Sequence, residues 1–306
     1  MPKCWIQLIT GSVVIFFAGK KYPLYADFFI SQIKIKSPFL RTITCHILHA
    51  LPEFCIILST ISIIKQPDVG LGTVLGATLF NFVIIGGILL KNQEKDKDFL
   101  SVLFIITFLS LLAFSLGLKI SLGFLKVGLA SMVMLAGYVM YIRLFPVSET
   151  LESPKLEITP SVAYVRFILA TFLIFIGAGQ VVYAAKVMLK YVPSSYLIGS
   201  FLLAPIACCP KLSSLCSKGK PIFDLKMILE TNILVLGLLG FLIDFFYYPS
   251  VIFGYTNYNL FYLALEGLIL SFLYLGTIKW FTYQKFLSSI MLLVYIGSVL
   301  CFISLR

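Results

Sequence analysis

The chain has 306 residues, of which 60% are hydrophobic and 12% are charged, and its mean hydropathy is +1.02. Soluble domains carry about 25% charged residues, so this composition excludes a soluble protein and predicts one with many membrane spans. The net charge of +11 is then expected to come from lysines in loops on one side of the membrane, not from binding of nucleic acid. The seven cysteines lie mostly inside apolar runs, and their odd number argues against a disulfide framework. The sequence contains no catalytic triad, Walker loop or glycine-rich nucleotide motif, so we expect no enzyme, no cofactor and no nucleotide.

Ten apolar segments of about the length needed to cross a bilayer follow one another along the chain. They cover residues 5–19, 38–63, 69–90, 99–117, 121–145, 161–184, 194–217, 225–246, 258–277 and 281–304. These segments predict an all-α membrane protein with about ten transmembrane helices. The first segment has no convincing cleavage site of small residues, so we interpret it as an uncleaved span.

The distribution of Lys and Arg predicts the orientation of these spans. Sixteen of the 24 basic residues lie in or beside the loops that follow the first, third, fifth, seventh and ninth spans, and seven lie on the other side. Cytoplasmic loops carry the excess of Lys and Arg. We therefore expect a multi-pass protein of the cell (inner) membrane with both termini on the non-cytoplasmic side.

Two apolar runs each contain a proline followed directly by one ionisable residue. They are "HALPEFCII" (49–57), with Pro52 and Glu53, and "ACCPK" (207–211), with Pro210 and Lys211. The two motifs are 158 residues apart, and Gly19, Ala26 and Ser37 have identical counterparts at the same offset. Each half then holds five spans, and an odd number places the second half upside down. The predicted organisation is a first repeat (1–147), a hydrophilic linker (148–160) and a second, inverted repeat (161–306), an architecture typical of secondary transporters.

The first motif has the chemistry of a cation site. Pro52 removes a backbone donor and leaves carbonyl oxygens unpaired, and such carbonyls are tolerated at membrane depth only beside protein or water. A glutamate inside a membrane costs about 2.5–3.5 kcal/mol on insertion scales, so Glu53 is a candidate site residue by default. The alternative is a proline kink in which Glu53 is neutral or has a structural partner.

The segment "ALPEFCIILSTISIIKQPDVGLGTVLGATLFNFVIIGGILL" (50–90) resembles the first alpha repeat of the calcium/cation antiporter superfamily, the Na⁺/Ca²⁺ exchanger family. The family pattern there is close to G-T-S-L-P-E followed by D-(I/L)-x-x-G-N-(V/I)-(I/L)-G-S-N-(I/L)-F-N. The resemblance implies a compact, bacterial-type cation antiporter that carries Ca²⁺ or Na⁺. It also implies that Glu53 matches the first motif glutamate, that Asn81 matches the last asparagine, and that Gly72 and Gly76 are packing glycines.

The chain departs from this pattern at several positions. His49 and Ala50 replace the threonine and serine before L-P-E, Ala77 and Thr78 replace the S-N pair, and the second repeat is degenerate, with Lys211 at the position of its glutamate. The segment "ETN" (230–232) is aligned with the later ligands of the second repeat, which makes Asn232 a candidate. The candidate ion-binding or coupling residues are therefore Glu53, Lys211, Asn81, Thr78, His49 and Asn232, with Pro52 and Pro210 as helix breaks.

Ca²⁺ takes 6–8 oxygen ligands, whereas Glu53 and a charged Lys211 sum to zero charge. Three interpretations stay open. The leading one is an antiporter with altered coupling, in which alternating access operates around a midplane site and the buried lysine releases a proton when a cation arrives. In the second, His46, His49, Cys45 and Cys208 favour a transition metal in a proton-coupled transporter. In the third, the pair is a structural lock in a scaffold-like protein that transports nothing.

Overall fold

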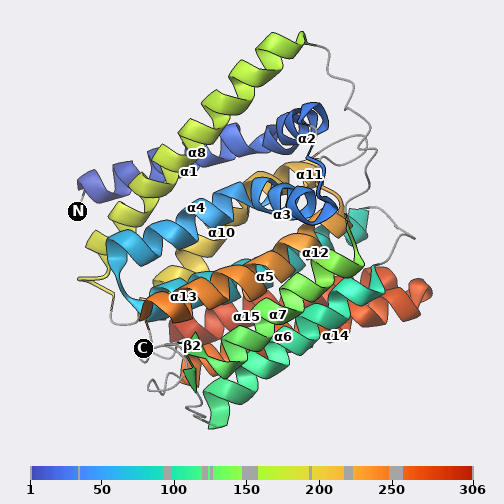
Figure 1. Cartoon of the computed structure of the whole chain (residues 1–306). Coiled ribbons are helices and arrows are strands. Elements are labelled where there is room, and N and C mark those ends of the chain that lie inside the picture. The colour runs from blue at the N-terminus through green and yellow to red at the C-terminus, as the bar shows by residue number, and fades with distance from the viewer. Residues whose placement is uncertain are drawn as a thin grey trace.

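The computed structural model of the chain is a bundle of helices (Figure 1). The structure describes residues 2–33, 35–91, 98–118, 123–124, 127–146, 158–192, 195–216, 223–247 and 258–304. The predicted linker lies almost wholly outside these residues. The fold class predicted from the sequence is confirmed as all-α, apart from one short hairpin.

The first half of the chain contains seven α-helices and one hairpin among the described residues. The elements are α1 (Pro2–Lys20), α2 (Tyr22–Gln32), α3 (Pro38–His49), α4 (Leu51–Ser59), the π-helical η1 (Thr60–Ile64), α5 (Pro67–Lys91), α6 (Phe99–Leu118), β1 (Gly123–Phe124), β2 (Val127–Gly128) and α7 (Leu129–Leu144). The two strands pair antiparallel, with Gly123 opposite Gly128 and Phe124 opposite Val127.

The second half is helical throughout its described residues and is interrupted more often. Its elements are α8 (Pro160–Met188), α9 (Ser195–Leu197), the π-helical η2 (Ile198–Leu203), α10 (Ala204–Cys208), the 3₁₀ turn η3 (Cys209–Leu212), α11 (Ser213–Cys216), α12 (Leu225–Leu234), the π-helical η4 (Val235–Leu239), α13 (Gly240–Tyr247), α14 (Tyr258–Lys279), η5 (Phe281–Tyr283) and α15 (Gln284–Ser304). Helix breaks of this kind at membrane depth are tolerated where protein surrounds the backbone.

Local sequence signals explain several helix boundaries. Proline stands in the first turn of α3, where its missing N–H has no partner to lose, and Ser37 caps that helix by accepting from the N–H of Leu40. Asp224 caps α12 by accepting from the N–H of Met227 at 2.7 Å. The helix that begins at Leu51 ends at Lys65, which adopts a left-handed conformation with φ of 59°.

Among the described residues, seven helical segments are long and apolar enough to cross a membrane, or eight if the bent pair Pro38–His49 and Leu51–Ile64 is one span. Helix α7 is apolar but has only 16 residues, and α1 has 19. Nine of the ten segments predicted from the sequence coincide largely with helical structure in the described residues, and the fifth (121–145) is helical from Leu129 to Leu144. The protein is therefore a multi-pass membrane protein, while the full count of ten spans stays a prediction.

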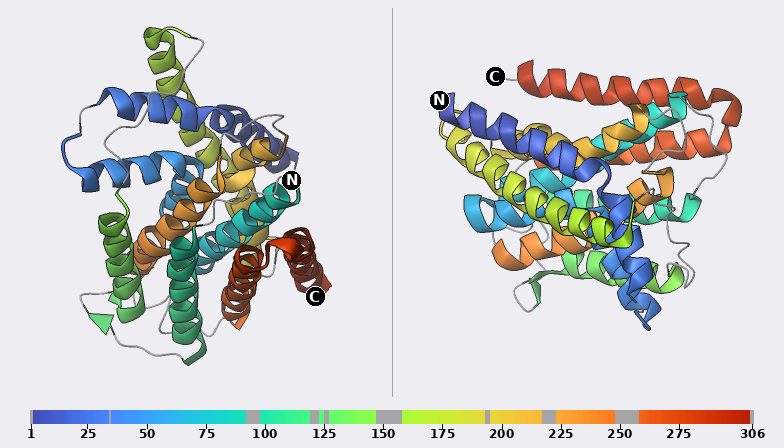
Figure 2. Two further views of the ribbon diagram at one scale, coloured as in Figure 1. Left: turned by 90° about the vertical axis from the view of Figure 1, so that its right-hand side faces the viewer. Right: turned by 90° about the horizontal axis from the view of Figure 1, so that it is seen from above.

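Corresponding helices of the two halves run antiparallel where they touch. In the α1–α8 pair, Cys4 contacts Ala184 and Gly11 approaches Gly177, so the two helices run in opposite directions. Helices α5 and α12–α13 also run antiparallel. Gly70 of α5 approaches Ile243 of α13. Asn81, eleven residues later in α5, is hydrogen-bonded to Asn232, which lies eleven residues earlier than Ile243. The α1–α8 pair lies on one side of the bundle, away from α6 and α14 (Figures 1 and 2). An inverted repeat requires this antiparallel relation, and the inversion of the complete halves stays a prediction.

Glycines of α5 allow the second half to approach its backbone closely. A Cβ atom at Gly76 would stand 2.5 Å from the Cα of Ser200, and one at Gly72 would stand 2.8 Å from the carbonyl oxygen of Tyr196. Real Cβ atoms do not come this near to backbone, so both positions need glycine. This contact holds α5 against η2 and brings residues on either side of it, Asn81 of α5 and Lys211 of η3, within reach of each other.

Candidate functional site

Glu53 and Lys211 meet in the interior of the bundle. Glu53 lies in the first turn of α4, directly after the 76° bend that separates α3 from α4, and Lys211 lies in the short turn η3. Pro52 and Pro210 precede them, and Gly19 of α1 packs against both prolines. Glu53 is 0% exposed and Lys211 is 1% exposed, and the Nζ of Lys211 forms an ion pair with Oε1 of Glu53.

Two asparagines extend the pair into a polar chain. The Nζ of Lys211 also donates to Oδ1 of Asn81 at 3.2 Å, and the Nδ2 of Asn81 donates to Oδ1 of Asn232 at 2.7 Å. All four side chains are buried, and they come from α4, α5, η3 and α12. The ammonium group thus lies between a carboxylate oxygen and an amide oxygen, which are the ligand types that hard cations prefer.

The electrostatics of this arrangement depend on the pairing. An isolated buried carboxylate or ammonium loses several kcal/mol of hydration, and mutual attraction offsets this loss only when further hydrogen bonds complete the geometry. Asn81 supplies such a bond to the lysine. The net charge of the four side chains is zero, so in this conformation the lysine neutralises the charge that a bound cation would otherwise neutralise.

Two hydroxyl groups near the pair donate to carbonyls of their own helices, which leaves their oxygen lone pairs available. Thr78, a predicted oxygen ligand, donates its Oγ1 to the carbonyl of Val74 at 3.1 Å, one turn back along α5. Thr231 behaves in the same way toward Met227 at 2.8 Å. Cys208 directs its Sγ toward the carbonyl of Ala77 at 3.8 Å. The structure therefore brings Glu53, Lys211, Asn81 and Asn232 together but leaves the hydroxyl of Thr78 on its own helix.

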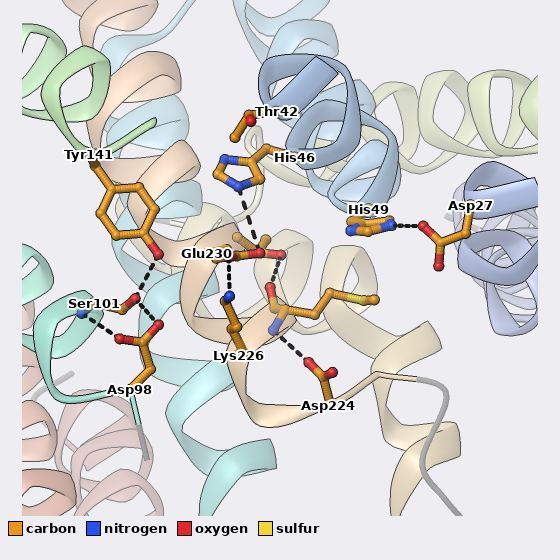
Figure 3. A network of polar contacts seen from close by, with 12 residues as sticks. Asp27, Thr42, His46, His49, Asp98, Ser101, Tyr141, Asp224, Lys226 and Glu230 are labelled. Atoms are coloured by element: carbon orange, nitrogen blue, oxygen red, sulfur yellow. Dashed lines mark hydrogen bonds and ion pairs between the residues drawn. The ribbon is translucent and has the colours of Figure 1, made fainter. Parts of the chain in front are cut away.

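His49 lies apart from Glu53. Its Nε2 is 2.7 Å from Oδ1 of Asp27, a residue of α2 that the sequence did not single out. His46, one turn earlier on α3, faces Glu230 of α12 instead (Figure 3). Among the described residues, no group of three or more His, Cys, Asp or Glu side chains is placed to hold a metal ion. The soft-ligand set considered from the sequence is therefore not assembled.

Two other buried acids lie in the second half of the chain. Asp244 of α13 accepts from the backbone N–H of Gly128 at 2.6 Å and so satisfies a donor at the start of α7. Glu266 of α14 is 6% exposed, and burial among apolar helices makes it a secondary candidate for handling protons. Neither acid joins the chain of polar side chains around Lys211.

The arrangement of the helices is shared with solved structures of cation exchangers. The chain has 18% identity and a TM-score of 0.61 to a sodium-calcium exchanger, NCX_Mj, soaked with Na⁺ and Sr²⁺, covering 97% of both chains. It has 12% identity and a TM-score of 0.61 to an H⁺/Ca²⁺ exchanger, CAX, covering 97% of this chain and 88% of the other. It also has 12% identity and a TM-score of 0.65 to native YfkE, covering 98% of this chain and 91% of the other. No protein-family model and no curated protein matches the sequence. The resemblance seen in the sequence is thus confirmed as a shared fold.

Proposed function

We propose that the protein is a secondary active transporter that exchanges inorganic cations by alternating access around the Glu53–Lys211 pair. The observation that supports this proposal best is the position of the Lys211 ammonium, which lies between Oε1 of Glu53 and Oδ1 of Asn81. Two solved proteins of the same fold are named for exchange of Na⁺ with Ca²⁺ and of H⁺ with Ca²⁺. Because no ion is needed to neutralise Glu53 while Lys211 is charged, the lysine acts as a substitute for one cation.

The cycle follows from this substitution. When a cation reaches Glu53, two positive charges compete for one carboxylate, so Lys211 must either swing away or give up its proton. Asn81 and Asn232 then supply amide oxygens, and Thr78 supplies a hydroxyl oxygen while it donates to its backbone partner. The two halves move against each other and expose the site on the opposite side. Ca²⁺ and Na⁺ are the proposed substrates, and the protein lies in the inner membrane with both termini outside the cytoplasm.

A second candidate function is a non-transporting scaffold, and the complete burial of the pair favours it. Glu53 is 0% exposed and Lys211 is 1% exposed, so in this conformation no water reaches either group from outside the protein. A transporter in an occluded state and a permanently locked protein share this feature. Only a flux measurement separates the two.

The deciding experiment measures ion flux in proteoliposomes that contain the purified protein. Ca²⁺, Na⁺, K⁺, Mn²⁺ and Zn²⁺ are tested against imposed Na⁺ and proton gradients. Wild type is compared with Glu53→Gln, which keeps the shape but removes the carboxylate, and with Lys211→Met, which keeps the length of the side chain but removes the charge. Gradient-driven flux that Glu53→Gln abolishes supports the antiporter.

The scaffold makes the opposite prediction for the same vesicles. It predicts no flux from wild type under any gradient. A third variant, Lys211→Glu, restores the carboxylate that the family pattern has at this position. Ca²⁺ flux that appears only in this variant would mean that the lysine closes an otherwise competent site.

A further inference from the structure

A second polar cluster lies between α3 and α12. His46 of α3, Glu230 of α12 and Lys226 form its centre, and Asp98 and Asp224 lie nearby (Figure 3). The Nε2 of His46 is 3.6 Å from Oε2 of Glu230, and the Nζ of Lys226 is 3.8 Å from Oε1 of the same carboxylate. We call His46 and Glu230 the entry pair.

His46 is buried without the hydrogen bonds that its position demands. It is 2% exposed, and within the described part of the chain neither ring nitrogen has a hydrogen-bond partner. Buried polar side chains in proteins nearly always have one, so an unpaired group calls for an explanation. The rings of Tyr138 and Tyr141 lie 6.1 and 6.3 Å from the imidazole and flank it, while its Nε2 faces Glu230.

The spacing of the entry pair suits a bound metal ion. Ligand atoms about 2.1 Å from a tetrahedral ion stand roughly 3.4 Å apart, close to the 3.6 Å between Nε2 of His46 and Oε2 of Glu230. Imidazole nitrogen is a ligand for divalent transition metals, whereas Ca²⁺ takes oxygen ligands. Because the described residues offer no third His, Cys, Asp or Glu ligand here, water must complete the coordination, and binding is weak.

Charged groups of both signs lie around the entry pair. Lys226 is the charged group that acts most strongly on Glu230 and His49 acts in the same sense, whereas Asp224 and Asp98 act more weakly in the opposite sense from the ends of α12 and α6. The side chain of Lys226 is 64% exposed, so an incoming cation can take its place beside Glu230 and displace it into water.

The entry pair lies near the exposed start of α12. Along this helix the exposed fraction of the side chain falls from 64% at Lys226 to 13% at Glu230, and Asn232 is 0% exposed. Glu230 and Asn232 are two positions apart on α12, about 3 Å of helical rise, and side chains at this spacing point to different sides of a helix. We propose that His46 and Glu230 form a second, low-affinity site for divalent transition-metal ions, separate from the Glu53–Lys211 pair; its role in transport rests on the proposed function.

The test uses Mn²⁺ as a paramagnetic probe on the full chain in detergent micelles, in a Glu53→Gln/Lys211→Met background that disables the central site and leaves no unpaired buried charge there. Pulsed electron paramagnetic resonance detects coupling of Mn²⁺ to an imidazole nitrogen, and the chain has only two histidines. We expect the nitrogen coupling in the parent, its retention in His49→Gln and its loss in His46→Gln. Absence of coupling in the parent, or its survival in His46→Gln, would overturn the proposal.

Affinity measurements on the same protein provide an independent check. Glu230→Gln should weaken Mn²⁺ binding at least tenfold, and Lys226→Gln should strengthen it severalfold because a competing cation is gone. Unchanged affinity in Glu230→Gln, or weaker binding in Lys226→Gln, would contradict the proposed site. In proteoliposomes with an intact Glu53, His46→Gln should slow Mn²⁺ flux more than Ca²⁺ flux. An absence of all flux would refute the proposed function, while the nitrogen coupling would still establish the site.

Discussion

Removal of the charge of Lys211 should destabilise the protein strongly, and removal of both partner charges should not. In Lys211→Met, Glu53 stays fully buried without its cation, and breaking a buried ion pair in this way costs about 3–5 kcal/mol. The hydrogen bond from Lys211 to Asn81 is lost as well. Hydrogen bonds to charged groups contribute about 1.5–3 kcal/mol, and part of this contribution is already included in the cost of breaking the ion pair.

A double-mutant cycle isolates the interaction of the pair. Glu53→Gln, Lys211→Met and the combined variant are unfolded by titration with sodium dodecyl sulfate in mixed micelles, and tryptophan fluorescence reports the free energy of unfolding. We expect the combined variant to lose less free energy of unfolding than the two single variants lose together, with a difference of about 2 kcal/mol or more. Contacting residues typically show coupling of about 0.5–3 kcal/mol, whereas independent sites add to within about 0.3–0.5 kcal/mol. Additivity within that margin would refute a buried, energetically coupled pair.

Three further changes test other parts of the structure. Gly76→Val should abolish folding or flux, because a Cβ there would overlap the backbone of Ser200, while the same change at Gly179, which has nothing within 4 Å of its Cβ position, should be tolerated in size-exclusion and flux assays. Asn81→Asp should raise cation affinity about tenfold or more in Lys211→Met, since it places a second carboxylate beside Glu53; unchanged binding by isothermal titration would contradict the assigned site. Asp224→Ala should cost about 1 kcal/mol of unfolding free energy through loss of the α12 cap, and Asp224→Asn should recover most of it.

The sequence alone was sufficient for the elements whose signals are local. Runs of apolar residues marked the helical segments, because a membrane span must satisfy its backbone internally and bury no charge. Glu53 and Lys211 were paired from the 158-residue offset of their proline motifs, and the structure places them in contact. The resemblance of residues 50–90 to the first exchanger repeat identified the glycines of α5, whose missing Cβ atoms leave space for the second half.

Only the tertiary structure decided which partner each polar side chain takes. His49 stands four residues before Glu53 in sequence, yet it bonds Asp27, because the 76° bend between α3 and α4 turns the two side chains apart. The hydroxyl of Thr78 donates to a carbonyl of its own helix, a partner that the match to the family motif did not indicate. His46 and Glu230 are brought together from α3 and α12 by the packing of the two halves. Hydropathy and repeat spacing contain no information about such rotations and contacts, which depend on how the helices are packed in three dimensions.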